Sequence, residues 1–376
     1  MKVAILGGGP AGLYLSILLK RWGVTEDISV FEQNPKDATY GFGVGVADGA
    51  LHHFAKADAQ SHDAIQSALY RSESQDFESP HGELKLKWPA EIGTITRLTL
   101  LQVLQGQCDD LGIKVQHETR INSVSEFDNY DLVVAADGAN SVIREELIDL
   151  FGCKKQFLQN RFAWYGLETA LTSALRYRRH GDGVFIAHYY PYTEDMSTFL
   201  VEVDRETWED TGFGNKTDAE RKAISEDVFA DVLDGLPLVE NKSNWTQFQT
   251  IDCERWVTDR VALIGDAQYR AHFSIGSGTR LAMEDSIALA TAMKETPANV
   301  ALALSNFEAA RRPVKRKLMG AARKSYLWYD DVRKYIDLPL LEFGYNFLTR
   351  TGRMSDERLR SFLPDFMRDY DAYRAA

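Results

Sequence analysis

The sequence predicts an α/β fold in which a parallel sheet covered by helices is interleaved with a mainly antiparallel sheet and followed by a helical C-terminus. Residues 2–6 form a short apolar run that enters a glycine-rich turn, and apolar residues at helical spacing follow. Residues 155–253 instead contain alternating segments rich in aromatic and β-branched residues, as antiparallel strands do. A buried-strand pattern returns at residues 259–267, and helical patterns fill most of the remainder.

These patterns suggest where the domains begin and end. We expect the parallel-sheet domain to comprise residues 1–154 and 258–350, the antiparallel-sheet domain residues 155–257, and a helical tail residues 351–376. A chain of 376 residues, 44% of them hydrophobic, is long enough for two intertwined lobes. The charge-dense run at residues 306–318 is expected to mark a solvated helix face rather than a binding patch.

The composition disfavours several classes of function. The formal net charge of −12 argues against binding to nucleic acids or anionic membranes, because their phosphates repel an acidic protein. No apolar run approaches the roughly 18 residues of a membrane span, and the first residues do not match a secretory signal peptide. Cys108, Cys153 and Cys253 are scattered and lack CxxC spacing. We therefore expect neither a metal site nor a disulfide framework, and we expect a reducing cytoplasm as the compartment.

The N-terminal turn carries the first functional signal. Gly7, Gly9 and Gly12 stand in GxGxxG register between a strand and a helix, and the strand predicted at residues 28–32 ends in Glu32. Gly7 suits the tight turn, Gly9 lets the backbone approach a pyrophosphate, and Gly12 lets the helix pack against the sheet. The helix N-terminus favours phosphates, and Glu32 can bind a ribose diol. The pattern predicts a Rossmann-like dinucleotide site; a merely tight βα turn is the alternative.

Further along the chain, other segments offer contacts to the same ligand. Residues 40–46 form a glycine-rich loop that can admit a flat ligand, or else an ordinary surface loop. Arg97 lies at a strand–helix junction, where it can meet a phosphate or ribityl chain or can simply be solvated. Asp137 and Gly138 end another buried strand beside a helix start.

A second Gly-Asp turn follows the strand at residues 259–264, and a long helix opens near Gly276 and Gly278. One dinucleotide can be held at both ends. Asp266 can then bind a ribityl hydroxyl, and the positive end of the helix can face an isoalloxazine ring. The chain contains no second GxGxxG fold for another nucleotide.

Three motifs in this order, GxGxxG with Glu32, DGANSVIR and GDA…GSG, resemble the single-component flavoprotein aromatic hydroxylases of the 4-hydroxybenzoate 3-hydroxylase type. TYGFGVGVADGAL, RFAWYG, EDMSTFLVEVDRETW and AHFSIGSGTRLAMEDSIALA are similar to the narrower branch of salicylyl-CoA 5-hydroxylase and 2-aminobenzoyl-CoA monooxygenase. The violacein-pathway hydroxylases share HFSIG and MSTF. Where that branch usually has GDAAHTAHFSIG, this chain has Gln268, Tyr269 and Arg270 in place of Ala, His and Thr.

The resemblance implies noncovalent FAD, NADH or NADPH as reductant, and O2 that forms a C4a-hydroperoxyflavin, which hydroxylates an electron-rich aromatic ring. The residues implied to contact or position FAD are Gly7, Gly9, Pro10, Ala11, Gly12, Glu32, Gln33, Gly43, Arg97, Asp137, Gly138, Gly265, Asp266, Gly276, Gly278 and Thr279.

Five residues are candidates for the reacting end of the site. His272 lies between the second turn and the following helix, where it can accept a substrate proton or fix the ring, or else bond the local backbone. Tyr269 and Arg270 can shape the pocket or point to solvent. His188 and Tyr190 share a strand face and can line the pocket floor, or simply pack in the sheet. Glu202, a charge on an apolar strand, can pair with an arginine or face the pocket.

The expected function is hydroxylation of an aromatic ring carried as a CoA thioester of the salicylyl, benzoyl or anthraniloyl type. The alternatives are hydroxylation of a free indolic or phenolic intermediate and a non-catalytic flavin-binding protein. The expected partners are this small aromatic substrate and O2, with the chain as a monomer or homodimer.

Overall fold

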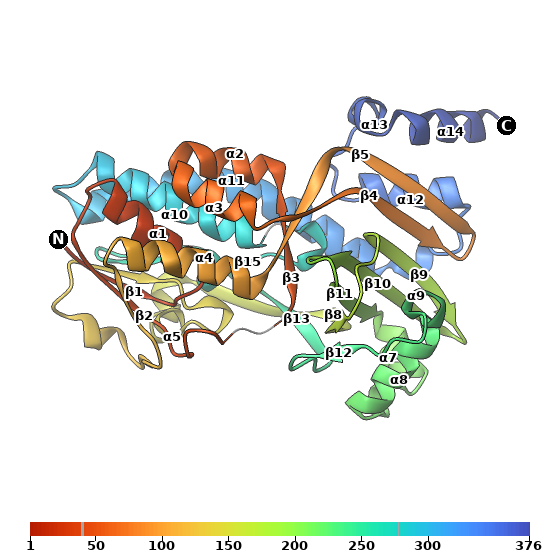
Figure 1. Ribbon diagram of the computed structural model, residues 1–376, viewed down its shortest axis with the longest axis horizontal. Helices are drawn as coiled ribbons and strands as arrows, with labels where there is room; N and C mark the ends of the chain where they lie inside the picture. Colours follow the sequence, from red (N-terminus) through yellow and green to blue (C-terminus); the bar gives the residue numbers. More distant parts are fainter. Residues whose placement is uncertain (39–40, 277) are drawn as a thin grey trace.

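The computed structural model describes residues 1–38, 41–276 and 278–376, so Tyr40 of the expected glycine-rich loop lies outside the described residues. Figure 1 shows an elongated molecule with the parallel sheet toward one end and the antiparallel strands and last helices toward the other. The predicted α/β fold with a helical C-terminus is confirmed. In the described part of the chain, no helix is both long and apolar enough to cross a membrane.

The parallel sheet has five strands in the order β14-β7-β1-β2-β6. Their bounds are Lys2–Leu6 (β1), Asp27–Phe31 (β2), Lys114–Gln116 (β6), Leu132–Ala135 (β7) and Val261–Leu263 (β14). Four of the five β1 residues are buried, because helices cover one face and shorter segments the other. All pairings are parallel, so the carboxyl ends of β1, β7 and β14 meet at one edge. The predicted turns therefore converge there.

The helices on the first face are α1 (Pro10–Arg21), α2 (Asp48–Ala57), α3 (Ala59–Ser67), α4 (Arg97–Asp110), α10 (Gly278–Glu295) and the start of α11 (Val300–Asp330). Helix α11 is long enough to serve two cores. Its first turns pack with α1 and α10, and its last turns pack against the antiparallel sheet through Trp328 and Tyr329. The other face of the parallel sheet carries short helices, among them α5 (Val142–Glu146) and α6 (Ile148–Phe151).

The large sheet follows the order β15-β13-β8-β11-β10-β9-β4-β5-β3, with β12 paired to β8. Its strands are β3 (Gly43–Ala47), β4 (Tyr70–Ser79), β5 (Gly82–Thr96), β8 (Cys153–Leu167), β9 (Ala174–His180), β10 (Gly183–Pro191), β11 (Ser197–Val203), β12 (Val239–Glu240), β13 (Thr246–Cys253) and β15 (Tyr269–Arg270). All of its pairings are antiparallel except that of β4 with β9. The sheet includes three strands that precede residue 155, and the domain boundaries given above remain predictions.

Helices cover both faces of this sheet. One face packs against α7 (Arg205–Asp210), α8 (Asp218–Val228) and α9 (Ala230–Leu233). The other packs against α11, α12 (Leu340–Thr349), α13 (Asp356–Phe362) and α14 (Pro364–Ala375). Single 3₁₀ turns fill connections: η1 (Val124–Phe127), η2 (Gly138–Asn140), η3 (Phe213–Asn215), η4 (Gly265–Ala267), η5 (Phe273–Ile275) and η6 (Val332–Lys334).

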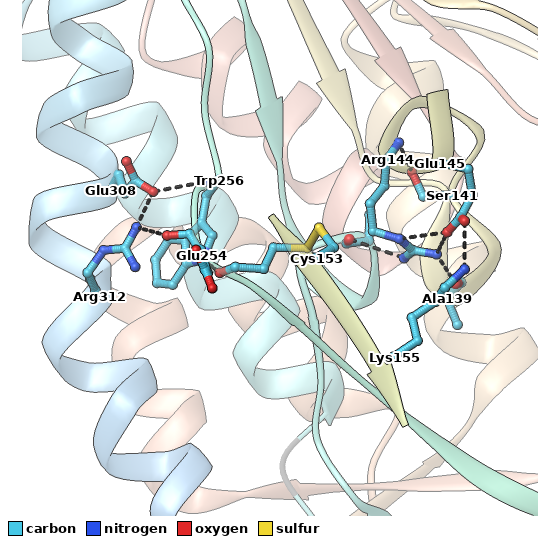
Figure 2. The surroundings of a disulfide bond; sticks show 12 residues. Ala139, Ser141, Arg144, Glu145, Cys153, Lys155, Glu254, Trp256, Glu308 and Arg312 are labelled. Atoms are coloured by element: carbon cyan, nitrogen blue, oxygen red, sulfur yellow. Dashed lines mark hydrogen bonds and ion pairs between the residues drawn. A yellow bond between two sulfur atoms is a disulfide. The ribbon is translucent and has the colours of Figure 1, made fainter. Parts of the chain in front are cut away.

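A disulfide joins Cys153 and Cys253, so the expectation that these cysteines stay unpaired was wrong. The spacing argument looked for local pairs, whereas antiparallel pairing of β8 with β13 places these residues, 100 apart in sequence, directly opposite each other. Figure 2 shows that the disulfide lies between two groups of interactions. Arg144 and its partners lie on one side of it, and on the other side Glu308 and Arg312 form hydrogen bonds with the backbone of Trp256 and Glu254. Cysteine usage no longer supports a reducing compartment, and the cytoplasm remains a prediction.

Candidate active site

The first turn is built from glycines that leave room for the backbone. Gly7 follows β1 with φ +103°, and a Cβ on it would lie 2.3 Å from the carbonyl oxygen of Ala136. A Cβ on Gly12 would lie 2.1 Å from the carbonyl oxygen of Gly7, so glycine there allows α1 to approach β1 closely. Gly9 differs, because no atom lies within 4 Å of its Cβ position. Its backbone is therefore accessible to a ligand at the N-terminus of α1.

A cavity of ≈ 370 Å³ opens at this turn, and its lining includes seven of the predicted cofactor residues: Gly7, Gly9, Glu32, Gln33, Arg97, Asp137 and Gly138. Glu32 accepts hydrogen bonds from the backbone N–H of Gly8 at 2.7 Å and from that of Asn34 at 2.8 Å. These two bonds fix the carboxylate at the edge of the cavity.

Asp137 supplies an acceptor that the protein does not use. Its Oδ2 accepts the backbone N–H of Val142 at 2.8 Å, while its buried Oδ1 has no hydrogen-bond partner among the described residues. Burial raises the pKa of this carboxyl, against the opposing effect of nearby Ser141 and Arg144. A buried acceptor without a partner is unfavourable, and a ligand hydroxyl in the cavity would satisfy it.

The second turn meets the first. Gly265 has φ +61°, and a Cβ there would lie 3.5 Å from Cβ of Ala11 and 3.3 Å from Cβ of Ala282. Ser286 of α10 donates a hydrogen bond to the carbonyl oxygen of Ala11 at 2.8 Å. The N-terminal part of α1 is therefore in contact with the middle of α10, and Pro10 occupies the first turn of α1.

Asp266 follows Gly265 and keeps 42% of its side-chain surface exposed. Partial desolvation by the surrounding protein raises the pKa of its carboxyl, and the charges of Arg270 and Arg97 oppose the rise. Next along the chain, Gly276 has φ +56° and ends η5, and α10 begins with Gly278 and Thr279.

Gly43 lies elsewhere, within β3. Its N–H donates to Oγ1 of Thr198 at 3.0 Å, and its carbonyl oxygen accepts from the hydroxyl of Tyr190 at 2.9 Å. These bonds attach β3 to β10 and β11.

A buried ionic network, which sequence reasoning missed, supports the second turn. Asp285 of α10 accepts from the N–H of Gly265 at 3.1 Å, from Nζ of Lys315 at 2.6 Å and from Nε of Arg311 at 2.9 Å. Lys315 is 1% exposed and Arg311 is 7% exposed. The expectation that the run at residues 306–318 is only a solvated helix face was therefore wrong for these two cations. Their i, i+4 spacing places both on one helix face, which was the available signal.

The three residues that depart from the branch pattern take different directions. Gln268 is fully buried, and its Oε1 accepts a hydrogen bond from Lys315. Tyr269 lies near the same lysine, whose Nζ is 5.9 Å from the ring centre. Arg270 stacks on Phe248 at 4.3 Å and lies 3.8 Å from Asp266. Gln268 and Tyr269 thus lie beside Lys315 of the ionic network, whereas Arg270 points away from it and packs on the Phe248 ring.

His272 is 4% exposed, and burial lowers its pKa to about 4, so its ring is neutral at pH 7. Its Nδ1 accepts from the backbone N–H of Ser274 at 3.3 Å, which corresponds to the structural alternative given above. The ring packs against Phe273 and Phe248, at centroid distances of 4.1 Å and 4.9 Å.

His188 and Tyr190 share one face of β10, and Tyr189 stacks on Phe199 on the other. The His188 ring contacts Phe273 at a centroid distance of 5.7 Å, so it lies beside the turn that leads into α10. Two of the predicted residues of the reacting end, His188 and His272, are therefore brought together around Phe273. The Tyr190 hydroxyl is instead occupied by the Gly43 carbonyl.

Comparisons with known proteins identify the family to which this chain belongs. The family model described as an FAD binding domain matches residues 1–322, so the chain belongs to this family and is an FAD-dependent aromatic monooxygenase. It is 35% identical, over 93% of this chain and 70% of the relative, to a salicyloyl-CoA 5-hydroxylase of a Streptomyces species.

Two further comparisons agree. The chain is 35% identical, over 94% of its length and 95% of the relative, to the 3-hydroxy-4-methyl-anthranilyl-[aryl-carrier protein] 5-monooxygenase of Streptosporangium sibiricum. The solved structure of 2-methyl-3-hydroxypyridine-5-carboxylic acid oxygenase, in a tetrameric form, matches its fold with a TM-score of 0.71 and 16% identity, over 96% of this chain and 95% of that one.

Proposed function

We propose that this monooxygenase uses NADH or NADPH and O2 to hydroxylate an activated aromatic ring carried as a thioester, in the first place an aromatic acyl-CoA. The observation that carries the substrate class is the 35% identity, over more than nine-tenths of the chain, to two enzymes named for thioester-linked aromatic acids. The relatives are named as hydroxylases or monooxygenases, so the non-catalytic alternative has no support.

The residues of the cavity fit FAD. Gly9 and the N-terminus of α1 would hold the pyrophosphate, since the open Cβ position leaves the backbone N–H groups accessible. Glu32 would bind the adenosine ribose, and the unpartnered Oδ1 of Asp137 would accept a hydrogen bond from a cofactor hydroxyl. Asp266 would bind the ribityl chain. FAD when bound supplies the oxygen activation, which no protein side chain can provide.

The protein side of the reaction is orientation and exclusion of water. His272 stays neutral at pH 7 and cannot present a cation to the substrate ring. Phe248 and Phe273 pack around it and would keep water from the reacting carbon. The ring would then lie between the second turn and β10.

A second candidate is hydroxylation of a free indolic or phenolic compound. The chain is 30% identical, over 93% of its length and 94% of the relative, to the protodeoxyviolaceinate monooxygenase of Chromobacterium violaceum. Because Gln268, Tyr269 and Arg270 lie in the second turn, their departure from the branch pattern keeps this candidate open.

A substrate screen separates the candidates. The FAD-loaded protein is offered NADH or NADPH with salicylyl-, anthraniloyl- and benzoyl-CoA, with the matching free acids, and with indoles and phenols. We expect one thioester to stimulate nicotinamide oxidation and to gain one oxygen atom by mass spectrometry. Turnover of a free indole or phenol, with every thioester inert, would contradict the thioester proposal. Light scattering in the same preparation tests the prediction of a monomer or homodimer.

A further inference from the structure

Helix α11 carries a concentration of positive charge in a chain whose net charge is −12. Between Glu308 and Asp330 the helix contains seven basic residues and no acidic one. Three of the seven form ion pairs with carboxylates of the same chain: Arg311, Arg312 and Lys315. The other four determine the charge of the outer surface of the helix.

These four cations make up what we call the α11 basic face: Arg316, Lys317, Arg323 and Lys324. All four are exposed, and none forms an ion pair with another described residue. The spacing of seven residues places the second pair two turns beyond the first, about 10 Å along the axis and on the same side of the helix. Gly320 lies between the pairs, is exposed, and has no atom within 4 Å of its Cβ position. A partner can therefore approach the helix closely between the two pairs.

Nearby acids do not neutralise the α11 basic face. The charge of Arg316 reaches Asp252 of β13, but these two side chains form no ion pair. Asp330, the next acid along the helix, is partly buried, and burial together with the charge of Glu202 raises its pKa to about 7. About half of it is therefore protonated at pH 7. Four like charges within three helical turns repel one another, so an anionic partner would stabilise this face.

The opposite side of the same part of α11 contacts the candidate active site. Oγ of Ser325 lies 2.8 Å from Oγ of Ser274 in η5, and the Tyr329 ring lies 5.4 Å from the His188 ring. A partner on the α11 basic face is therefore separated from the candidate active site by the width of one helix, about 10 Å. Gly276, which ends η5, is exposed, so the backbone beside this turn is open to the surface.

The shape of the α11 basic face favours a protein partner. A small anion such as a phosphate is held tightly when several donors converge on it, whereas these cation pairs stand apart on a convex helix surface. A membrane-binding helix needs a continuous apolar face, whereas only Val314 and Leu327 are exposed large apolar residues beside the cations. A helix of an acidic protein, in contrast, can place carboxylates seven residues apart and match both pairs at once.

We propose that the α11 basic face docks an acidic carrier protein, which bears the aromatic acid as a thioester on a flexible phosphopantetheine arm. This inference rests on the proposed function and names what carries the thioester. The docked carrier would lie one helix width from the candidate active site, and its arm would bring the aromatic ring past η5. Complementary charge on the two surfaces would speed the encounter and exclude other proteins. CoA thioesters share the arm but lack the docking protein, so they remain minimal substrates.

The test measures binding and turnover separately. The probe is a bacterial acyl carrier protein of negative net charge, prepared with a salicylyl thioester on its arm and with the free thiol. Fluorescence anisotropy gives the Kd of each form for the FAD-loaded enzyme, and KM is measured for the carrier thioester and for salicylyl-CoA. We expect both carrier forms to bind, and to bind at least about tenfold more weakly when salt rises from about 0.1 M to about 1 M, because the screening length falls from about 10 Å to about 3 Å.

Two charge-reversal variants locate the docking surface. Arg316→Glu with Lys317→Glu, and Arg323→Glu with Lys324→Glu, each place like charges against the carrier. Each should raise the Kd for both carrier forms and the KM for the carrier thioester by at least about tenfold. The KM for salicylyl-CoA should stay within about twofold of the wild type. Flavin content and thermal melting verify folding, and either variant serves if the other does not fold.

The control is Lys85→Glu with Lys87→Glu, which changes the net charge by the same amount. Both lysines are exposed on β5. They alternate with Leu84 and Leu86, which pack toward the core shared with the end of α11, so the lysines point away from that helix. The control should bind the carrier within about twofold of the wild type, which separates a local contact from the effect of total charge.

The outcomes separate the two proposals. If the wild type binds no carrier, or if both reversal variants bind it like the wild type, this inference is wrong, and turnover of a CoA thioester would still support the proposed function. If the reversals raise the KM for salicylyl-CoA as much as the Kd for the carrier, the face binds CoA phosphates and the inference is also wrong. Binding to vesicles of anionic lipid without binding to the carrier would overturn it as well. If the reversals abolish carrier binding but no thioester is hydroxylated, the docking surface stands and the proposed function fails.

Discussion

Replacing Gly12 and Gly9 by alanine separates two functions of the same turn. A Cβ on Gly12 would lie 2.1 Å from the carbonyl oxygen of Gly7 and 3.1 Å from the side chain of Ile5. Real Cβ atoms keep at least about 3 Å from such atoms, so α1 must move away from β1 by about 1 Å. A shift of this size in a packed core costs about 3 kcal/mol.

The matched substitution is Gly9→Ala. The Gly9 backbone is ordinary, with φ −80°, and no atom lies within 4 Å of the Cβ position. The apo protein should therefore lose less than about 1 kcal/mol of unfolding free energy, the cost of alanine at a helix N-cap. The new methyl group would, however, occupy the cavity where a pyrophosphate approaches, and FAD affinity should fall by at least about tenfold, or about 1.4 kcal/mol.

Melting of the apo proteins and titration of FAD give the two readouts. With an unfolding entropy near 2 cal/mol/K per residue, the G12A loss corresponds to a fall in Tm of about 4 °C. G9A should melt within about 1 °C of the wild type and show the weakened FAD binding. If G12A melts like the wild type, or if G9A binds FAD as tightly as the wild type, the assignment of these two glycines is refuted.

Three further predictions concern stability. Reducing the disulfide, or Cys153→Ser, should lower the free energy of unfolding by about 5 kcal/mol, the loop-closure entropy of roughly 100 residues. Calorimetry with and without reductant measures the loss, and equal Tm values would contradict this. Lys315→Met should lower the free energy of unfolding, measured in urea, by about 3 kcal/mol because it disrupts a buried ion pair. Lys317 is exposed, so the control Lys317→Met should lower it by less than about 0.5 kcal/mol. Equal losses in the two variants would count against the buried network. Two groups make opposite contributions to stability between pH 4 and 6.5. His272 has a folded pKa of about 4, so in this range the unfolded chain binds more protons there, and its contribution to stability rises with pH. Asp330 has a folded pKa of about 7, so the folded chain binds more protons there, and its contribution to stability falls with pH. Asp330→Asn leaves only the first effect, so its stability should rise more steeply with pH than that of the wild type, and parallel curves would contradict the assignment.

The order of elements around the first sheet could be predicted because each signal is local. The glycines of the first turn, the apolar run before them and the Gly-Asp pair at residue 265 constrain only neighbouring backbone, and the structure places both turns at one sheet edge. Long-range pairing could not be predicted in the same way. The disulfide depends on the register of β8 against β13, and the burial of Lys315 depends on which face of α11 meets Asp285.

The candidate site likewise contains residues that local sequence signals placed correctly and residues that only long-range packing brings together. Seven predicted cofactor residues line one cavity, and six of them follow β1, β2 or β7, whose ends must converge in a parallel sheet; Arg97 instead follows β5 of the large sheet. The contacts of Glu202 of β11 come from side chains of β8 and β10 that meet it only in three dimensions, Asn160 and His188. The sequence offered only the oddity of a charge on an apolar strand.

The Cys153–Cys253 bond has a mechanical consequence. The chain leaves the parallel-sheet side at one cysteine and returns to it at the other, so a pull applied to the two termini would travel through the sulfur bridge and bypass the strands between them. A single protease cut between residues 153 and 253 would likewise release no fragment until a thiol reagent is added. The cut protein would therefore run as one band on a non-reducing gel and as two fragments on a reducing gel.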